Sequence, residues 1–239
     1  EGEWRIFTGD QIGALFADWE LTCAKAAGKD LTKCAFVAST VSSKMLKKMA
    51  ETEGMRFEET LTGFKWMANK SLDLEKEGYT VLLSYEESIG FCVGDLVRDK
   101  DGVCGMTVFA EYVGELHRQG KALAQRLEEL YQKYGYFMTK NRYFLSYDPE
   151  VTNKLFSDLK GENYPTSLGP YAIKNVRDLK SPGYDNSKPG NQPDLPVSSG
   201  TNMITFTFEN GAVITMRTSG TEPKIKYYCE AVESTREKT

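Results

Sequence analysis

Several features that mark broad classes of protein are missing from this sequence of 239 residues. No run of apolar residues approaches the roughly 20 that a helix needs to span a bilayer, and the first residues form neither a basic leader nor an apolar segment. The five cysteines include no Cys-x-x-Cys pair, which argues against both a disulfide framework and a thiolate zinc site. These absences predict a cytoplasmic protein with no membrane association.

A strong imbalance of charge is also missing. Thirty Lys and Arg residues stand against 34 Asp and Glu residues, for a formal charge of -4, and the two signs are mixed along the chain. Because nucleic-acid binding requires a basic patch or stripe that follows the phosphate backbone, nucleic acid is not expected as a partner. A small anionic ligand stays open, since it needs only a local cluster of donors.

The first part of the chain alternates strands with helices. Helical periodicity is present over about 10–27, 42–53, 65–77, 103–118 and 123–134. An apolar β-branched run lies at 34–40, and further strands are predicted at 55–59 and 80–85. Strands that alternate with helices of this length imply crossover connections and hence a mostly parallel sheet. Residues 1–135 are therefore predicted to form an α/β domain.

The second part of the chain has a different pattern. Alternating strands are expected at 136–147, 171–178, 203–208, 212–217 and 224–232, with one helix after Asp148-Pro149. Glu209-Asn210-Gly211 indicates a hairpin, because Asn-Gly tolerates the positive φ of a tight turn. Residues 180–200 hold four of the eight prolines and predict a long surface loop. Residues 136–239 are therefore predicted to form a smaller α+β domain on an antiparallel sheet.

The stretch that carries the most chemistry is Arg217-Thr218-Ser219-Gly220-Thr221-Glu222-Pro223-Lys224. A guanidinium, hydroxyls, a glycine and a lysine lie within eight residues. A phosphate dianion is bound by such groups: an Arg fork, hydroxyl donors and a concave run of backbone N–H groups. The alternative is a polar hairpin loop, since Ser, Gly, Thr and Pro are also ordinary turn residues.

A second stretch, Tyr85-Glu86-Glu87-Ser88-Ile89-Gly90, follows a predicted parallel strand, where open α/β sheets bind their ligands. A carboxylate and a hydroxyl two residues apart, Glu86 and Ser88, suit two adjacent sugar hydroxyls. A solvated turn is the alternative. A hydrolase using Glu86 and Glu87 as an acid-base pair is disfavoured, because neighbours on an extended segment point to opposite faces.

Two further segments are candidates for the same ligand. Thr62-Gly63-Phe64-Lys65-Trp66 places an aromatic ring and an amine at the start of a predicted helix, a pattern that core packing with an extended lysine also explains. Lys100 lies in a charged segment, Arg98 to Gly102, which otherwise serves as a turn that caps the next helix.

Taken together, these stretches resemble the α-D-phosphohexomutases, a family of four-domain enzymes that includes phosphoglucomutases and phosphomannomutases. The stretch from Arg217 to Lys224 closely resembles the phosphate-binding loop of the last domain of that family. The resemblance implies that the phosphate is bound by Arg217, Ser219, Gly220, Thr221 and Lys224.

The other stretches are similar to elements of the family's third domain. Glu86 and Ser88 match the carboxylate and hydroxyl of its Gly-Glu-x-Ser-Gly-type sugar loop, although Tyr85 replaces the first glycine and Ile89 precedes Gly90. The resemblance implies that sugar is also contacted by Gly63, Phe64 and Lys65, in a loop that closes over the substrate, and by Lys100.

The similarity is strongest to the eukaryotic second-type phosphoglucomutase branch, which includes phosphopentomutases and glucose 1,6-bisphosphate synthases. It carries over Phe57 to Trp66 and Arg217 to Tyr228. It implies that residues 1–135 are the third domain of such an enzyme and that residues 136–239 are its fourth domain, truncated at the C-terminus.

The family's catalytic parts have no counterpart in this sequence. Neither the Thr-x-Ser-His-Asn-Pro-type loop with its phosphoryl-carrying serine nor the Asp-x-Asp-x-Asp-Arg loop that binds Mg²⁺ occurs in it. The chain is therefore expected to be the substrate-binding C-terminal half of a phosphosugar mutase, inactive alone, with no catalytic or metal-binding residue of its own. Its expected partners are a phosphosugar substrate and the missing N-terminal domains of the same polypeptide. The resemblance also implies Mg²⁺ in those domains and glucose 1,6-bisphosphate as an activator.

Alternatives remain at this point. A glucose 1,6-bisphosphate synthase of the same branch and a non-catalytic sugar-phosphate-binding module both fit the sequence. Hexose and pentose phosphates are not distinguished by it either.

Overall fold

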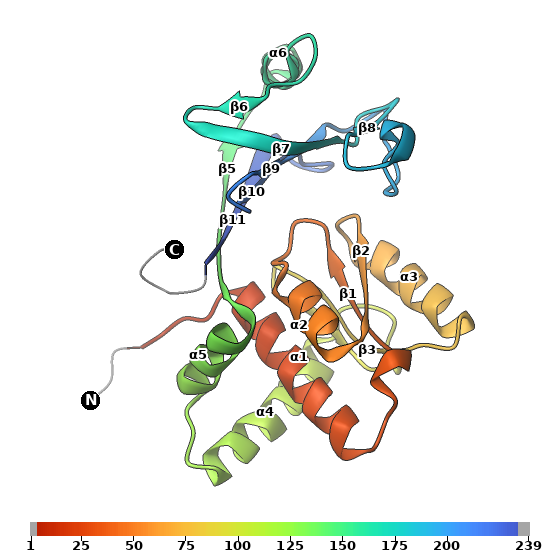
Figure 1. Cartoon of the computed structure of the whole chain (residues 1–239), viewed down its shortest axis with the longest axis vertical. Coiled ribbons are helices and arrows are strands. Elements are labelled where there is room, and N and C mark those ends of the chain that lie inside the picture. The colour runs from red at the N-terminus through yellow and green to blue at the C-terminus, as the bar shows by residue number, and fades with distance from the viewer. Residues whose placement is uncertain (1–3, 234–239) are drawn as a thin grey trace. The chain divides into compact units, whose positions relative to one another are not determined.

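The structure, a computed structural model, describes residues 4–233, and it contains two compact units that meet in sequence between Phe137 and Met138 (Figure 1). The first unit is an α/β fold and the second an antiparallel sheet with one helix, which confirms the predicted fold class. The assignment of 1–135 and 136–239 as third and fourth domains stays a prediction. Within 4–233, none of the helices is long and apolar enough to cross a membrane.

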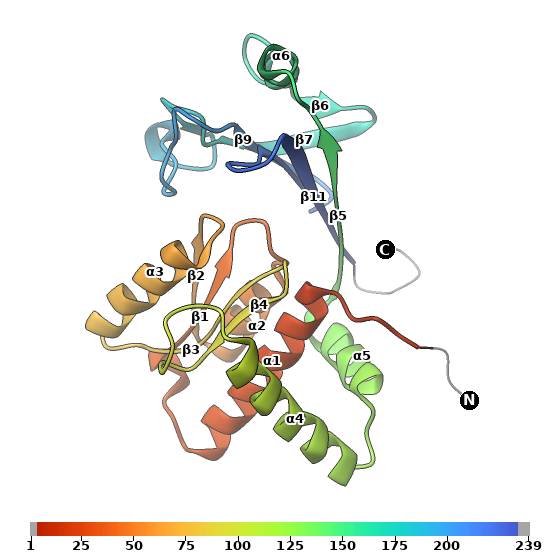
Figure 2. The same ribbon diagram turned by 180° about the vertical axis from the view of Figure 1, so that it is seen from behind.

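The first unit is built on a four-stranded sheet with the order β2-β1-β3-β4. Strand β1 pairs in parallel with both β2 and β3, and β4 adds an antiparallel edge. Its elements are α1 (Gly9–Ala26), β1 (Cys34–Ser39), α2 (Met45–Glu53), β2 (Arg56–Thr60), α3 (Phe64–Lys76), β3 (Thr80–Glu86), β4 (Gly90–Val93), α4 (Gly102–Arg118) and α5 (Leu123–Tyr134), with a short 3-10 turn η1 (Leu31–Lys33) before β1. Helix α4 lies beside β4 (Figure 2).

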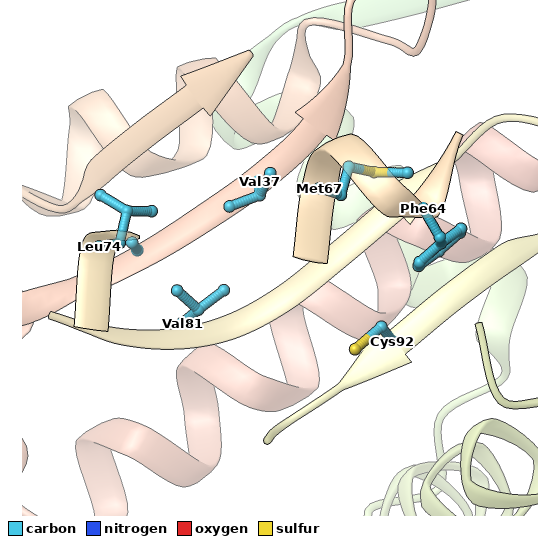
Figure 3. Packing of buried hydrophobic residues seen from close by; sticks show 7 residues of the cluster. Val37, Phe64, Met67, Leu74, Val81 and Cys92 are labelled. Carbon is cyan, nitrogen blue, oxygen red and sulfur yellow. The ribbon is translucent and has the colours of Figure 1, made fainter. Parts of the chain in front are cut away.

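Helices cover both faces of this sheet, whose central strand β1 is buried on both sides. Every residue of β1 is buried. On one face, α3 contributes Phe64, Met67 and Leu74 to a cluster with Val37 and Val81 (Figure 3). On the other face, α1 approaches β3 so closely that a Cβ added to Gly13 would lie 2.6 Å from the Tyr85 ring. This second contact explains why Gly13 lies in the middle of a helix, where glycine is otherwise unfavourable.

Local sequence determines where α1 begins. Thr8 is its N-cap: the hydroxyl accepts the Gln11 N–H, and the Gln11 side chain accepts the Thr8 N–H. This capping box satisfies two backbone donors that the first turn leaves open. Asp10, in the first turn of α1, does not cap the helix. Asp10 is instead buried, where its carboxylate accepts the backbone N–H of Ser43 at 2.8 Å.

Strand β4 was not predicted from the sequence. It forms a hairpin with β3 in which Glu86 pairs with Gly90. The candidate sugar loop is therefore the turn of a β-hairpin at the carboxyl end of a parallel strand. Strand β4, Gly90-Phe91-Cys92-Val93, is only four residues long, too short for its periodicity to reveal it.

The second unit is one seven-stranded antiparallel sheet with a helix on one face. The strand order is β5-β11-β10-β9-β7-β6, with β8 paired to β7. The bounds are β5 (Tyr136–Leu145), α6 (Pro149–Lys160), β6 (Ser167–Leu168), β7 (Tyr171–Asp178), β8 (Tyr184–Asp185), η2 (Pro189–Asn191), β9 (Met203–Phe208), β10 (Val213–Thr218) and β11 (Lys224–Glu233). Phe156 of α6 lies in a core with Ile204, Phe206 and Ile225 of the sheet.

The predicted hairpin at Glu209-Asn210-Gly211 is confirmed. Strands β9 and β10 are antiparallel, Gly211 has φ of 85°, and the Asn210 side chain accepts the Ala212 N–H. The expected long loop at 180–200 was only partly right, because it contains β8 and η2. Asp185 is buried there and accepts two hydrogen bonds from Ser187, so side-chain bonding replaces hydrophobic periodicity in ordering the segment.

Candidate functional site

In the first unit, the structure brings together residues from three of the candidate segments. Gly90 lies so close to Phe64 and Glu86 that an added Cβ would be 2.7 Å from Phe64 Cε2 and 2.9 Å from Glu86 Cγ. The Lys100 ammonium lies 5.4 Å from the centroid of the Phe64 ring. We call Phe64, Glu86, Ser88 and Lys100 the hairpin site, since all four lie at or beside the β3–β4 turn.

Phe64 belongs both to the core and to the hairpin site. It is the first residue of α3 and is 5% exposed. Its N-cap, Gly63, has φ of 107°, a conformation that glycine adopts with little cost. The backbone conformation of Gly63 therefore directs the chain so that the Phe64 ring packs against the sheet and its edge lies close to Gly90. Core packing and a role beside the loop, which the sequence posed as alternatives, are combined in one side chain.

The remaining members of the predicted sugar set differ in exposure. Lys65 is exposed, and its ammonium lies 5.6 Å from the centroid of the neighbouring Trp66 ring. Ser88 is exposed, whereas Glu86 is half-buried. Lys100 is exposed, and the capping of α4 expected of this segment is performed by Asp101, which accepts the N–H groups of Val103 and Cys104.

The hairpin turn itself has a strained backbone. Ile89 has φ of 61°, which is unfavourable for a β-branched residue. Its side chain is 67% exposed, so apolar burial of that side chain does not offset the cost. The neighbouring backbone is held on its inner side by α1, since a Cβ added to Gly9 would lie 2.0 Å from the Glu87 carbonyl oxygen. Such strain concentrates at functional sites, where surrounding contacts enforce it.

Glu87 occupies a buried position directly behind the exposed turn. It is 9% exposed, while Glu86 is half-buried on the other side of the chain. Burial, together with the nearby charges of Asp10 and Glu86, raises the pKa of Glu87 above its ordinary value of 4.5. The two glutamates therefore lie in different environments and do not form an acid-base pair around one bond.

In the second unit, the stretch from Arg217 to Lys224 comprises the end of β10, the turn that follows it and the first residue of β11. Ser219 N–H donates to the Lys224 carbonyl at 2.9 Å, and Thr221 N–H lies 3.5 Å from Ser219 Oγ. We call residues 218–224 the β10–β11 loop. Thr218 anchors its first end, because its hydroxyl accepts the Asn202 N–H at 3.0 Å and its own N–H donates to the Asn202 carbonyl. Ser146 N–H fixes the other end by donating to the Pro223 carbonyl at 2.9 Å.

A cavity of about 410 Å³ lies against the β10–β11 loop. Its lining includes Ser219 and Lys224 together with Tyr147, Lys180 and Asn202. The last three residues come from distant segments, and sequence reasoning missed them. These residue types show no distinctive spacing along the sequence. Tyr147 and Asn202 lie here because Ser146 and Asn202 hold the two ends of the loop.

The predicted phosphate ligands do not all lie together. Successive side chains of a strand alternate between faces, so Arg217 projects from the face opposite to Thr218. Its guanidinium carbon lies 5.7 Å from the Tyr228 ring centroid, and its Nε donates to the Tyr228 hydroxyl at 3.3 Å. Lys224 is paired with Glu222 at 2.7 Å, and this hydrogen bond raises the pKa of Lys224 and lowers that of Glu222. Gly220 and Thr221 are exposed at the tip.

Comparison with known protein families identifies both units. The family model described as "Phosphoglucomutase/phosphomannomutase, alpha/beta/alpha domain III" matches residues 8–134, more than half of the chain. The model of the "Phosphoglucomutase/phosphomannomutase, C-terminal domain" matches residues 172–239. The chain belongs to the phosphoglucomutase/phosphomannomutase family. The resemblance drawn from the Arg217 and Glu86 stretches is thereby confirmed.

Individual relatives come from the branch that the sequence indicated. A human phosphopentomutase is 47% identical over 236 residues, which cover 96% of this chain and 38% of the relative. A human glucose 1,6-bisphosphate synthase is 46% identical, covering 98% of this chain and 38% of the relative. The chain thus spans well under half the length of these curated relatives.

A solved structure supports the fold. The open form of parafusin, a phosphoglucomutase from Paramecium, is similar with a TM-score of 0.64 at 18% identity, over 99% of this chain and 38% of that structure. A putative phosphomannomutase from Thermus thermophilus gives a TM-score of 0.60 at 16% identity, over 95% of this chain and 38% of that structure. At this level of identity the similarity concerns the fold alone.

Proposed function

We propose that this chain provides the substrate-binding part of a phosphosugar mutase that interconverts sugar 1-phosphates with sugar 6- or 5-phosphates. The observation that carries the proposal is the hairpin site, where Glu86 and Phe64 meet at Gly90 with Lys100 over the ring. A carboxylate, a hydroxyl and an ammonium grouped around a turn at the carboxyl end of β3 suit a polyhydroxylated ligand. We assign Glu86, Ser88 and Lys100 to the sugar, with Gly63, Phe64 and Lys65 as the adjoining loop.

The β10–β11 loop and Arg217 are proposed to bind the phosphate that does not react. Ser219, Gly220 and Thr221 supply hydroxyl and backbone donors, Arg217 supplies a guanidinium, and Lys224 supplies a second cation. Because Lys224 is paired with Glu222, phosphate has to compete with that carboxylate. Binding energy gained at this end of a substrate orients its reacting end.

Phosphoryl transfer itself is assigned to a phosphoserine outside this chain, acting through a bisphosphate intermediate. Within residues 4–233, no group of three or more His, Cys, Asp or Glu side chains is arranged to hold a metal ion. We therefore assign none of the described residues to Mg²⁺, which belongs with the domains that carry the phosphoserine. Glucose 1,6-bisphosphate is the proposed activator, and the cytoplasm is the proposed location.

The experiment that tests this function is an assay of the whole protein with glucose 1-phosphate and ribose 1-phosphate in parallel, with residues 1–239 alone as the control. Turnover by the whole protein and none by the isolated chain is expected. Turnover by the isolated chain, or no reaction of either substrate with the whole protein, would contradict the proposal.

A second candidate, glucose 1,6-bisphosphate synthesis, is favoured by the synthase relatives at 46% identity. Net formation of glucose 1,6-bisphosphate, in excess of isomerised monophosphate, would support the synthase over the mutase.

A further inference from the structure

A closed cluster of polar side chains lies beneath the hairpin site. Ser39, at the end of β1, and Ser42, in the turn that follows, are 0% and 4% exposed. Their hydroxyl oxygens are 2.7 Å apart, and each lies near Glu87 Oε2, at 3.3 and 3.4 Å. The Glu87 N–H also donates to Ser42 Oγ at 3.1 Å. Glu87 is thus joined to the β1–α2 turn through both its side chain and its backbone.

The number of hydrogens in this cluster determines which form of Glu87 it favours. Three oxygens, Ser39 Oγ, Ser42 Oγ and Glu87 Oε2, make three mutual contacts. Each hydroxyl carries one hydrogen, so an ionised carboxylate leaves one of the three contacts without a hydrogen. A proton on Oε2 supplies the third, and all three contacts then become hydrogen bonds in a ring. Buried polar groups strongly favour such complete satisfaction.

The same carboxyl also orients Ser88. The Ser88 hydroxyl donates to Glu87 Oε1 at 3.0 Å, so its hydrogen is directed inward. Its oxygen is then left to accept from a ligand hydroxyl on the exposed side. On the other side of the turn, Glu86 lies against Gly90 and Phe64. Fixing Glu87 therefore fixes both neighbours that face the proposed sugar.

We infer that Glu87 is a positioning residue, which holds Glu86 and Ser88 in their sugar-binding orientation by bridging the hairpin turn to Ser39 and Ser42. The inference rests on the proposed sugar-binding function of the hairpin site. It assigns Glu87 no contact with the substrate. Its role is to keep the strained turn at Ile89 in one conformation and to make Ser88 an acceptor.

The charged and titratable groups around Glu87 predict how this device depends on pH. Helix α1 contributes Asp10, which accepts a hydrogen bond from the Tyr85 hydroxyl of β3 at 3.1 Å, and the end of β3 contributes Glu86. Burial and these two carboxylates raise the pKa of Glu87, so the neutral form persists above 4.5. The ring of hydrogen bonds is therefore complete at low pH and is lost as pH rises through the raised pKa of Glu87. Sugar binding should weaken over the same interval.

The test compares Glu87→Gln and Glu87→Ala in the whole protein, with KM for the sugar phosphate measured across pH. Gln keeps the shape and supplies an N–H in place of the carboxyl O–H at every pH. Glu87→Gln should keep KM for the sugar phosphate within about twofold of the low-pH wild-type value and should abolish the increase of KM with pH. Glu87→Ala should raise KM about tenfold, the effect of losing one or two buried hydrogen bonds. Glu51→Gln, on the exposed surface of α2, is the matched control and should change neither quantity.

A second measurement keeps the inference separate from the proposed function. Amide hydrogen exchange of the turn, residues 88–90, should accelerate in Glu87→Ala and in Ser39→Ala/Ser42→Ala, but not in Glu87→Gln. If the wild-type protein binds no sugar phosphate but amide exchange in the variants changes as expected, the proposed function is wrong and the bridging role of Glu87 is supported. Unchanged KM and exchange in Glu87→Ala would overturn the inference, as would a Glu87→Gln variant as impaired as Glu87→Ala.

Discussion

Replacing Gly90 by alanine tests the geometry of the hairpin site with a single methyl group. Gly90 has no positive φ, so the change imposes no backbone penalty of that kind. The added Cβ would instead lie 2.7 Å from Phe64 Cε2, 2.9 Å from Glu86 Cγ and 3.1 Å from Glu86 Oε1. All three distances are well inside van der Waals contact, so Phe64 or Glu86 has to move.

The size of the effect of Gly90→Ala depends on which of the two side chains moves. Phe64 is 5% exposed and packed among Met67, Val37 and Cys92 (Figure 3), so moving its ring disturbs the core. Overpacking of this kind costs about 1–3 kcal/mol. Glu86 is half-buried and moves more easily. We therefore expect Glu86 to take most of the displacement. If about 1–3 kcal/mol is lost from the free energy of sugar binding, the affinity falls by about 5- to 150-fold.

The assay measures KM for the sugar phosphate in the whole protein and, in parallel, the denaturant midpoint of this chain. Gly102→Ala is the matched control, because an added Cβ there meets nothing within 4 Å and Gly102 begins α4. We expect Gly90→Ala to raise KM while the midpoint falls only slightly, and Gly102→Ala to leave both unchanged. A Gly90→Ala protein with wild-type KM would refute the placement of Glu86 at the sugar.

Three further predictions concern other parts of the chain. Arg217→Ala should raise KM for the phosphosugar about 10-fold or more through loss of charge-assisted hydrogen bonds, and an unchanged KM would remove Arg217 from the phosphate site. Asp18→Asn should lower the free energy of unfolding, measured with denaturant, by about 2 kcal/mol, because Asp18 is buried and accepts two Arg126 bonds at 2.6 and 2.8 Å; an unshifted midpoint would contradict this. Burial of Glu53 is outweighed by hydrogen bonds from two lysines and a tyrosine, which lower its pKa to about 2. Stability present above pH 4.5 should therefore be lost as pH falls toward 2, by roughly 2–3 kcal/mol, and Glu53→Gln should flatten that part of the pH profile.

The long elements could be predicted from the sequence because their signals are local. The helical period around α1, the all-apolar run of β1 and the Asn210-Gly211 turn each specify a structure within a few residues. Strands β4, β6 and β8 could not be predicted, because a strand of two to four residues is too short to show a hydrophobic period. Their conformation depends on hydrogen bonds to β3 and β7, which are formed only once the sheet exists.

The candidate site was predictable as a set of residues and not as an arrangement. Chemistry and resemblance together selected Glu86, Ser88 and Lys100. Neither indicated that the Phe64 ring would lie close to both Gly90 and the Lys100 ammonium. The predicted phosphate ligands are close together in the sequence, which suggests a single cluster. Alternation along β10 instead directs Arg217 to the face opposite Thr218. The distances between side chains of different segments depend on strand pairing and packing, which no single segment of the sequence determines.

The contrast between Glu86 and Glu87 shows most clearly what packing adds. On the sequence they are adjacent identical residues, and alternation along an extended chain says only that they point to opposite sides. Which of the two faces solvent depends on two sets of contacts. Gly9 of α1 allows close approach to the Glu87 carbonyl, and Glu87 Oε2 lies near Ser39 at the end of β1 and Ser42 in the turn after it. Once those contacts enclose Glu87, desolvation separates the two carboxyls chemically: the inner one favours a proton and holds the turn, and the outer one stays available to a ligand. A loop with one glutamate would have to supply both functions from the same side chain, so the pair is better understood as a support and a contact than as two contacts.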